Sequence, residues 1–276
     1  MQLVIQGNEV ETSDLKALAK LAGASAIEAI TPQAFRLRNA QPHAGIAAHC
    51  EHAQLDCAFV PDDRTLASMQ LCVMDMDSTL ITIECIDEIA DMQGLKPQVA
   101  AITAAAMRGE LDYPQSLRQR VALLEGLDAG ALQRVYDERL HLSPGAEIML
   151  AKFRQLDIKT LLVSGGFTFF TERLKQRLHI DYARSNVLEI ANGKLTGRVC
   201  GEIFDANSKL AAMLEVRNEL GIDAGQVIGL GDGANDLKFM TATGISVAYH
   251  AKPVVRAQAT HALNFVGLDG VLNLFA

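Results

Sequence analysis

From about residue 70 onward, three short apolar runs are separated by longer helix-patterned stretches. The runs are LCVMD (71–75), IKTLLVS (158–164) and QVIGLGD (226–232), and each ends in polar or glycine residues. This alternation is typical of a parallel α/β sheet. Because ligands of such a sheet bind beyond the carboxyl ends of its strands, we expect the three run ends to form one site.

The segment between the first two runs is much longer than a crossover needs. Its pattern is almost wholly helical over about 86–142, whereas a crossover takes about a dozen residues. The excess predicts an inserted helical cap. A further helix is expected to begin next, with Ser143 as N-cap and Pro144 at the first helical position.

Residues 1–68 predict a separate small α+β module. The stretches LVIQ, AFRLR and LDCAFVP read as strands, and SDLKALAKLAG reads as a helix. The histidine-rich stretch around Cys50 is interpreted as a loop rather than a metal site. A turn at 61–63 marks the boundary with the second domain, 69–276.

Composition and charge narrow the function classes. The chain is 49% hydrophobic and 21% charged, as expected of a packed globular protein. The net charge of -8 argues against nucleic-acid and anionic-membrane partners, which need basic surfaces. Lacking a long apolar run and a basic leader, and with five widely spaced cysteines, the chain is expected to be cytoplasmic.

Two carboxylates lie at the end of the first run, because Asp75 is its last residue and Asp77 follows two positions later. On an extended backbone they would face the same way, which is unfavourable without a partner. A divalent cation resolves the crowding, because Mg²⁺ prefers oxygen ligands and is held by one or two carboxylates plus substrate phosphate. Asp232, at the end of the third run, supplies a further carboxylate.

The other parts of a phosphoryl-transfer site are also present. Asp75 is a candidate nucleophile, and Asp77 can protonate the leaving oxygen and later deprotonate the attacking water. Ser164 and the amides from Gly165 onward form a turn rich in hydrogen-bond donors, and Lys209 offers a positive charge for the phosphate.

DMDSTL, VSGGF, Lys209 and GDGANDL together resemble the four motifs of the haloacid dehalogenase superfamily, and their spacing resembles its phosphoserine phosphatase branch. The resemblance covers residues 75–276. It implies a Rossmann-like parallel sheet with a helical cap. The resemblance implies that Asp75 is the nucleophile and Asp77 the general acid/base. It implies that Mg²⁺ is bound by the Asp75 carboxylate, the Asp77 main-chain carbonyl and Asp232. It also implies a phosphate site made of Ser164, Gly165 and Lys209, with Asn235 close by and with Thr79 and Asp236 in supporting positions.

The resemblance also implies how the cap selects its substrate, O-phospho-L-serine. Glu84 matches the residue that meets the ammonium group, and Arg120 matches the carboxylate clamp, with Arg118 as its nearest competitor. Opposite charges at the two positions suit a zwitterionic amino acid. Met107 and Tyr113 are expected to line the apolar wall, and the tyrosine hydroxyl must find a partner or reach solvent.

Several alternatives stay open from sequence alone. The chain can be a phosphatase of another small phosphomonoester or a phosphotransferase. The Glu84 and Arg120 pair favours phosphoserine, because a sugar phosphate gives neither residue a charged partner. A binding protein on an inactive enzyme fold is disfavoured because every catalytic residue type is present. The N-terminal module resembles a divergent ACT-type domain or is a structural or dimerising module, and a homodimer is left open.

Overall fold

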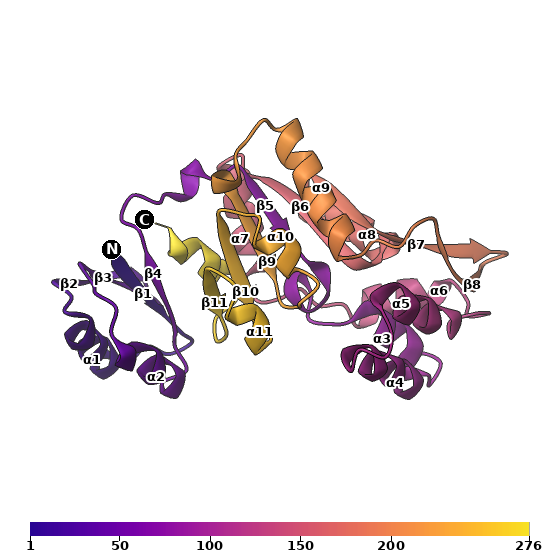
Figure 1. Cartoon of the computed structure of the whole chain (residues 1–276), viewed down its shortest axis with the longest axis horizontal. Helices are drawn as coiled ribbons and strands as arrows, with labels where there is room; N and C mark the ends of the chain where they lie inside the picture. Colours follow the sequence, from indigo (N-terminus) through magenta and orange to yellow (C-terminus); the bar gives the residue numbers. More distant parts are fainter. Residues whose placement is uncertain (276) are drawn as a thin grey trace. The chain divides into compact units, whose positions relative to one another are not determined.

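A computed structural model describes residues 1–275 of the chain (Figure 1). It has an α/β fold with two sheets. A four-stranded sheet has the order β2-β3-β1-β4, and a seven-stranded sheet has the order β11-β10-β9-β5-β6-β7-β8. Parallel pairing joins β9 to β10, β10 to β11 and β6 to β7, whereas β8 runs antiparallel to β7. The predicted mostly parallel sheet is confirmed.

The three apolar runs are strands of the larger sheet. They form β5 (Leu71–Met74), β6 (Lys159–Phe167) and β9 (Val227–Gly231). The prediction of a turn at the end of the second run was wrong in detail. Strand β6 continues through both glycines to Phe167, and its pairing with β7 shifts register on the way.

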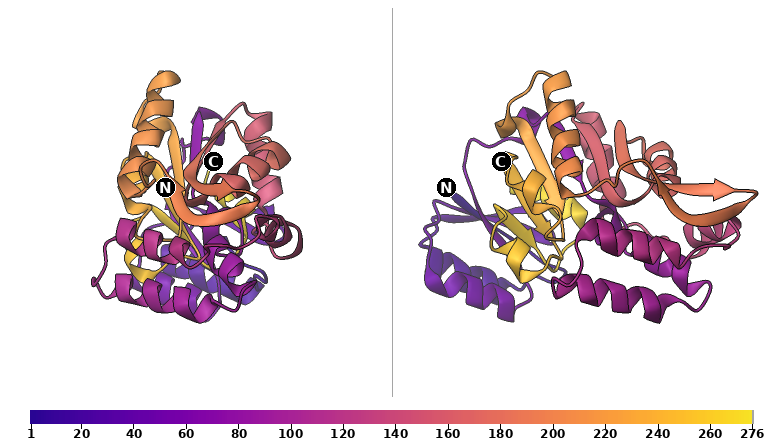
Figure 2. Two further views of the ribbon diagram at one scale, coloured as in Figure 1. Left: turned by 90° about the vertical axis from the view of Figure 1, so that its right-hand side faces the viewer. Right: turned by 45° about the vertical axis from the view of Figure 1, so that its right-hand side comes forward.

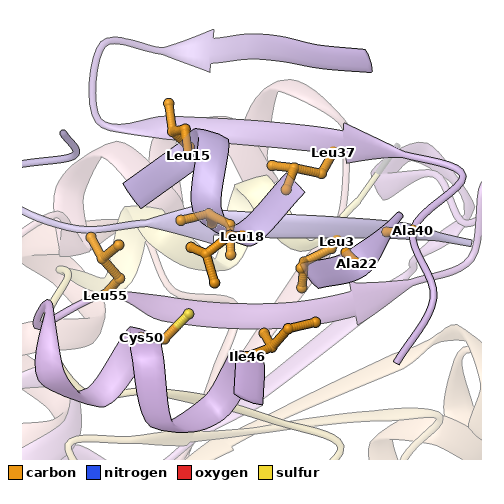
Figure 3. Close-up of a cluster of buried hydrophobic side chains, with 10 residues drawn as sticks. Leu3, Leu15, Leu18, Ala22, Leu37, Ala40, Ile46, Cys50 and Leu55 are labelled. Carbon is orange, nitrogen blue, oxygen red and sulfur yellow. The ribbon is translucent and has the colours of Figure 1, made fainter. Parts of the chain in front are cut away.

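The N-terminal sheet belongs to a βαββαβ arrangement. Its elements are β1 (Gln2–Gln6), α1 (Thr12–Ala22), β2 (Ala26–Thr31), β3 (Ala34–Arg38), α2 (Ala44–His52) and β4 (Asp56–Val60). The predicted loop around Cys50 is therefore wrong, since this stretch forms α2. The side chain of His43 caps the helix by accepting from the Gly45 amide, and Ile46 and Cys50 are buried against the sheet. Figure 3 shows the resulting apolar core between sheet and helices.

Contacts divide the chain into two compact units. The first contains residues 1–72, 143–159 and the chain from residue 221 onward. Beside the N-terminal elements and β9 it holds α7 (Ala146–Gln155), α10 (Leu237–Met240), β10 (Ile245–Tyr249), α11 (Pro253–Arg256) and β11 (His261–Leu263), with 3₁₀ turns at Leu66–Ser68, Ala224–Gln226 and Leu268–Leu274.

Helix α7 begins later than expected. Its N-cap is Gly145, with φ at +75°, so Ser143 is not the cap and Pro144 is not the first helical residue. The Pro144 carbonyl instead accepts from the Leu268 amide, 2.7 Å away, which places this residue in a turn outside the helix.

The second unit contains residues 73–142 and 160–220. Its elements are α3 (Cys85–Asp91), α4 (Lys96–Met107), α5 (Tyr113–Ala122), α6 (Gly130–Glu138), α8 (Thr168–Leu178), β7 (Tyr182–Ala191), β8 (Lys194–Cys200) and α9 (Ala206–Glu219). Helices α3 to α6 pack on one another, and β8 packs against α5 (Figure 2). Strand β8 approaches α5 closely at Gly197, where a Cβ would lie only 3.3 Å from the Cα of Ala122.

Helices therefore fill the region predicted as a cap. The domain boundary near residue 68 and the limits of the cap remain predictions. Across residues 1–275, no helix combines the length and the apolar composition needed to cross a membrane.

Candidate active site

The two carboxylates after β5 bind different donors. The backbone makes a tight turn over Met76–Leu80, in which Ser78 takes a φ of +56°. Asp75 accepts from Lys209, whereas Asp77 accepts from the amide of Cys85 at 2.9 Å. The crowding expected on an extended backbone is thus avoided, because the turn gives each carboxylate its own partners.

Asp75 and Lys209 form a buried ion pair. The Lys209 Nζ lies 2.7 Å from Asp75 Oδ1, and the two side chains are 1% and 7% exposed. Lys209 lies in the first turn of α9, which Asp205 caps by accepting from the amides of Asn207 and Ser208. Because a charge so deeply buried is unfavourable without a partner, the pair holds the lysine beside the carboxylate.

The carboxyl group of Asp77 is held in a low-dielectric environment. Burial raises its pKa above the ordinary value, and hydrogen bonds from Cys85 and Ser164, with the charge of Lys209, oppose the rise. Its two oxygens accept from the Cys85 amide and, at 3.2 Å, from the Ser164 hydroxyl. A carboxyl group with a raised pKa can carry and release a proton near neutral pH.

The end of β6 presents Ser164 to this carboxylate. The Ser164 Oγ also accepts from the Gly166 amide at 2.8 Å. Side chains at the two glycines would collide with the site, because a Cβ on Gly166 would lie 2.8 Å from Asp77 Oδ2 and one on Gly165 only 2.2 Å from the Tyr113 hydroxyl. Glycine is therefore required at both positions.

The hydroxyl of Tyr113 has a hydrogen-bond partner in the structure. It begins α5, where Asp112 and Gln115 form a capping box, and its Oη donates to the Gly165 carbonyl at 3.1 Å. Burial raises the pKa of Tyr113 to about 12, so the hydroxyl stays protonated at neutral pH. The side chain therefore ties the start of α5 to the end of β6.

The two residues assigned to amino-acid recognition lie on the helical region. Glu84 is exposed, immediately precedes α3, and accepts from the Ser78 hydroxyl at 2.7 Å. Arg120 is half-buried, whereas Arg118 is exposed. Burial raises the pKa values of Asp87 and Tyr113, and the charge of Arg120 opposes both rises. Arg120 therefore lies on the side of α5 that carries Tyr113.

Met107, the other residue expected in the apolar wall, is 68% exposed at the end of α4. Thr79, expected to support the phosphate end, is fully buried in the turn after β5. Both assignments remain predictions.

The residues after β9 form a turn built on glycine. Asp236 is buried and accepts from the Gly233 amide at 3.1 Å. Asn235 is exposed, and a Cβ on Gly233 would lie 2.2 Å from its side-chain oxygen. Asp232 is half-buried, and its main-chain carbonyl accepts from the Lys252 amide at 3.3 Å.

Asp75, Asp232 and Asp236 make up an acidic group that could hold a metal ion. Carboxylate oxygens are hard ligands, and this donor set suits Mg²⁺. The side chain of Asp77 accepts from Cys85 and Ser164 instead, and the metal role of its main-chain carbonyl remains a prediction. Sequence reasoning had placed Asp236 in support rather than among the carboxylates of the group.

One residue of the site had no signal in the sequence. Asn186 is buried in β7, donates to the Gly165 carbonyl at 2.8 Å and accepts from the Phe204 amide at 2.7 Å. A single asparagine in a strand-like stretch does not reveal which loops it will join.

Comparisons with known proteins show which family the chain resembles. The sequence model described as haloacid dehalogenase-like hydrolase matches residues 72–241, and a domain of unknown function matches residues 3–46. A phosphoserine phosphatase of Polaromonas sp. (strain JS666) is 54% identical over 77% of this chain and 92% of its own length, and one of Albidiferax ferrireducens is 53% identical over 79% and 93%.

A solved structure extends the likeness over nearly the whole chain. The unliganded probable phosphoserine phosphatase of Vibrio cholerae has a TM-score of 0.88 and 37% identity, covering 99% of this chain and 86% of its own. The likeness therefore includes the N-terminal sheet. With the family match over residues 72–241, these comparisons show that the chain belongs to the haloacid dehalogenase-like hydrolase family.

Proposed function

We propose that the chain is a Mg²⁺-dependent phosphoserine phosphatase that hydrolyses O-phospho-L-serine to L-serine and phosphate. The observation that carries the proposal is the arrangement around Asp75. A buried lysine lies 2.7 Å from this carboxylate, and Asp77, with its raised pKa, bonds to Ser164. Relatives that share half of the sequence carry the same activity in their names.

The first chemical step belongs to the two aspartates. An oxygen of Asp75 attacks phosphorus, the bond from phosphorus to the serine oxygen breaks, and Asp77 gives its proton to that oxygen. A water molecule then attacks the aspartyl-phosphate, Asp77 takes the water proton, and phosphate leaves. Asp75 returns as a carboxylate, so the cycle balances.

The phosphoryl oxygens need positive and donor groups throughout. We assign this role to Lys209, Ser164 and the amide of Gly165, with Asn235 close by. Mg²⁺ would be held by the Asp75 and Asp232 carboxylates with the Asp77 main-chain carbonyl, and it would supply charge to the phosphoryl oxygens. The carboxylate of Asp236 would support Lys209 and the water molecules bound to the metal.

Recognition of the amino-acid end is assigned to the helical region. Glu84 offers an exposed carboxylate for the ammonium group, and Arg120 offers a guanidinium for the carboxylate. The half-buried position of Arg120 beside Tyr113 supports this choice over Arg118. Release of free L-serine would make this the last step of serine biosynthesis, in the cytoplasm.

The test is phosphate release by the purified protein with Mg²⁺. Phosphoserine is compared with phosphoethanolamine, which lacks the carboxylate, and with a sugar phosphate, and Asp75→Asn serves as the blank. We expect phosphoserine to be preferred, and the blank to lose at least ~10³-fold in kcat. Equal rates on all substrates would leave a phosphatase and refute the assignment to phosphoserine.

A matched pair of variants tests the clamp. Arg120→Ala is expected to raise KM for phosphoserine by ~30-fold or more, because a charged hydrogen bond to the substrate is lost. Arg118→Ala, on the exposed side of the same helix, should change it less than ~2-fold. The reverse result would move the clamp to Arg118.

A further inference from the structure

The carbonyl of Gly165 accepts two side-chain hydrogen bonds. Tyr113 Oη donates from the start of α5 at 3.1 Å, and Asn186 Nδ2 donates from β7 at 2.8 Å. Asn186 is only 2% exposed, so its amide is committed to protein partners. Two donors on one carbonyl fill both lone pairs and hold its direction.

The direction of this carbonyl sets that of a second group. The carbonyl of Gly165 and the amide of Gly166 belong to one planar peptide unit, in which the two bonds point in opposite directions. The amide donates to Ser164 Oγ at 2.8 Å, and Ser164 in turn donates to Asp77. Fixing the carbonyl therefore fixes the amide and, through it, the serine hydroxyl.

The other end of the Asn186 amide reaches a second phosphate-binding element. Its Oδ1 accepts from the Phe204 amide at 2.7 Å. Phe204 directly precedes Asp205, the N-cap of α9, and Lys209 lies in the first turn of that helix. Through Asn186, the end of β6 and the start of α9 are joined by hydrogen bonds to one buried side chain.

We propose that Asn186 is a positioning residue that sets the relative placement of Ser164 and Lys209, the two groups assigned to the transferred phosphoryl group. Tyr113 is the second donor to the same peptide and adds to the placement from the helical region. This inference rests on the proposed function only in that a phosphomonoester must be the substrate. It does not depend on which alcohol leaves.

The test compares Asn186→Ala with a buried control from the same pair of strands. Thr160 lies at the start of β6, is 4% exposed, and exchanges hydrogen bonds with Asp181 at 3.0 and 3.2 Å. Thr160→Val removes buried hydrogen bonds at the opposite end of the strand from Ser164. Kinetics are measured with phosphoserine and p-nitrophenyl phosphate, together with inhibition by inorganic phosphate and the thermal midpoint.

Asn186→Ala is expected to lower kcat by ~30-fold on both substrates and to raise the inhibition constant of phosphate by ~10-fold, as for misplaced hydrogen-bond donors. Thr160→Val should lower the thermal midpoint while leaving kcat and the inhibition constant of phosphate within ~2-fold of wild type. The inhibition constant does not depend on how much of the enzyme is folded, so lost stability alone cannot move it. Tyr113→Phe removes one donor of the two and is expected to cost ~5-fold in kcat.

Two safeguards keep the test decisive. Asn186→Leu, which fills the space without polar atoms, is measured alongside, and the result is taken from whichever variant folds. A phosphate inhibition constant and a kcat within ~2-fold of wild type in a folded variant would overturn the proposal. If the wild type hydrolyses p-nitrophenyl phosphate but not phosphoserine, the proposed substrate fails while this comparison still holds.

Discussion

Asp56 in β4 and Asp77 after β5 are both carboxyl groups with raised pKa values, and desolvation by the surrounding protein is the largest cause in each case. Their partners differ. Asp56 accepts from three consecutive main-chain amides, at Asn264 (2.7 Å), Phe265 (2.9 Å) and Val266 (3.1 Å). Asp77 accepts from one amide and from the hydroxyl of a serine.

Under the proposed function, the difference in partners separates a structural carboxylate, Asp56, from a catalytic one, Asp77. Three amides of one loop occupy both oxygens of Asp56 and cannot leave without unfolding that loop. The hydroxyl hydrogen of Ser164 can turn away from Asp77 while the serine oxygen stays bound to the Gly166 amide, which frees a carboxylate oxygen to exchange a proton with a substrate or water. Burial and a raised pKa therefore do not identify a catalytic acid until the partners are known.

The largest expected effect is on catalytic activity, which should depend on Asp77 and not on Asp56. Asp77→Asn should lower kcat for phosphoserine by ~10²–10⁴-fold, because an amide cannot protonate the leaving serine oxygen. The loss should be much smaller for p-nitrophenyl phosphate, whose leaving group needs no proton. Steady-state rates on both substrates measure the difference.

Equal losses on the two substrates would show that Asp77 acts on something other than the leaving group. The matched control is Asp56→Asn, which changes a buried carboxylate with a raised pKa that lies in the other compact unit. Its folded fraction should keep the wild-type preference between the substrates.

The fold was predictable where local pattern decides structure. The runs that form β5, β6 and β9 end near candidate site residues, and their consecutive apolar residues suffice to predict buried strands. Helix α2 was missed because its pattern is weak, with alanines and histidines and only Ile46 and Cys50 buried. The start of α7 was missed because the turn before it is set by a contact with Leu268, far away in the sequence.

The site divides in the same way. Motif spacing predicted Asp75, Asp77, Ser164 and Lys209 as site residues, and in the structure Lys209 donates to Asp75 and Ser164 donates to Asp77. Asn186 could not be found, because its role depends on two loops that meet only in the folded chain. Residues whose function depends on tertiary contacts carry no local sequence signal.

A second prediction tests the structural half of the comparison. Asp56→Ala leaves the amides of residues 264–266 without their acceptor, and the free energy of unfolding should fall by about 3–4 kcal/mol. For a chain of this size that lowers the thermal midpoint by ~6–12 °C. Differential scanning calorimetry measures the shift, and kcat of the folded enzyme should stay within ~2-fold of wild type. A loss of kcat with an unchanged midpoint would make Asp56 a functional residue after all.

The smallest effect concerns His261 in β11, which precedes the loop that binds Asp56. Burial and, to a smaller extent, the charge of Arg64 lower its pKa from 6.5 to about 4. Arg64 can only donate, so the ring nitrogen 3.3 Å away accepts and the imidazole is neutral. Between these pKa values the unfolded chain binds a proton that the folded chain does not, so stability is full above pH 6.5 and falls as the pH decreases toward 4. At pH 5 this group lowers the free energy of unfolding by about 2 kcal/mol.

Urea unfolding of the wild type and of His261→Gln at pH 7.5 and pH 5 isolates the contribution of His261, because all other titrating groups are shared. We expect the variant to lose less stability on acidification, and equal losses would mean that His261 is already protonated in the folded protein.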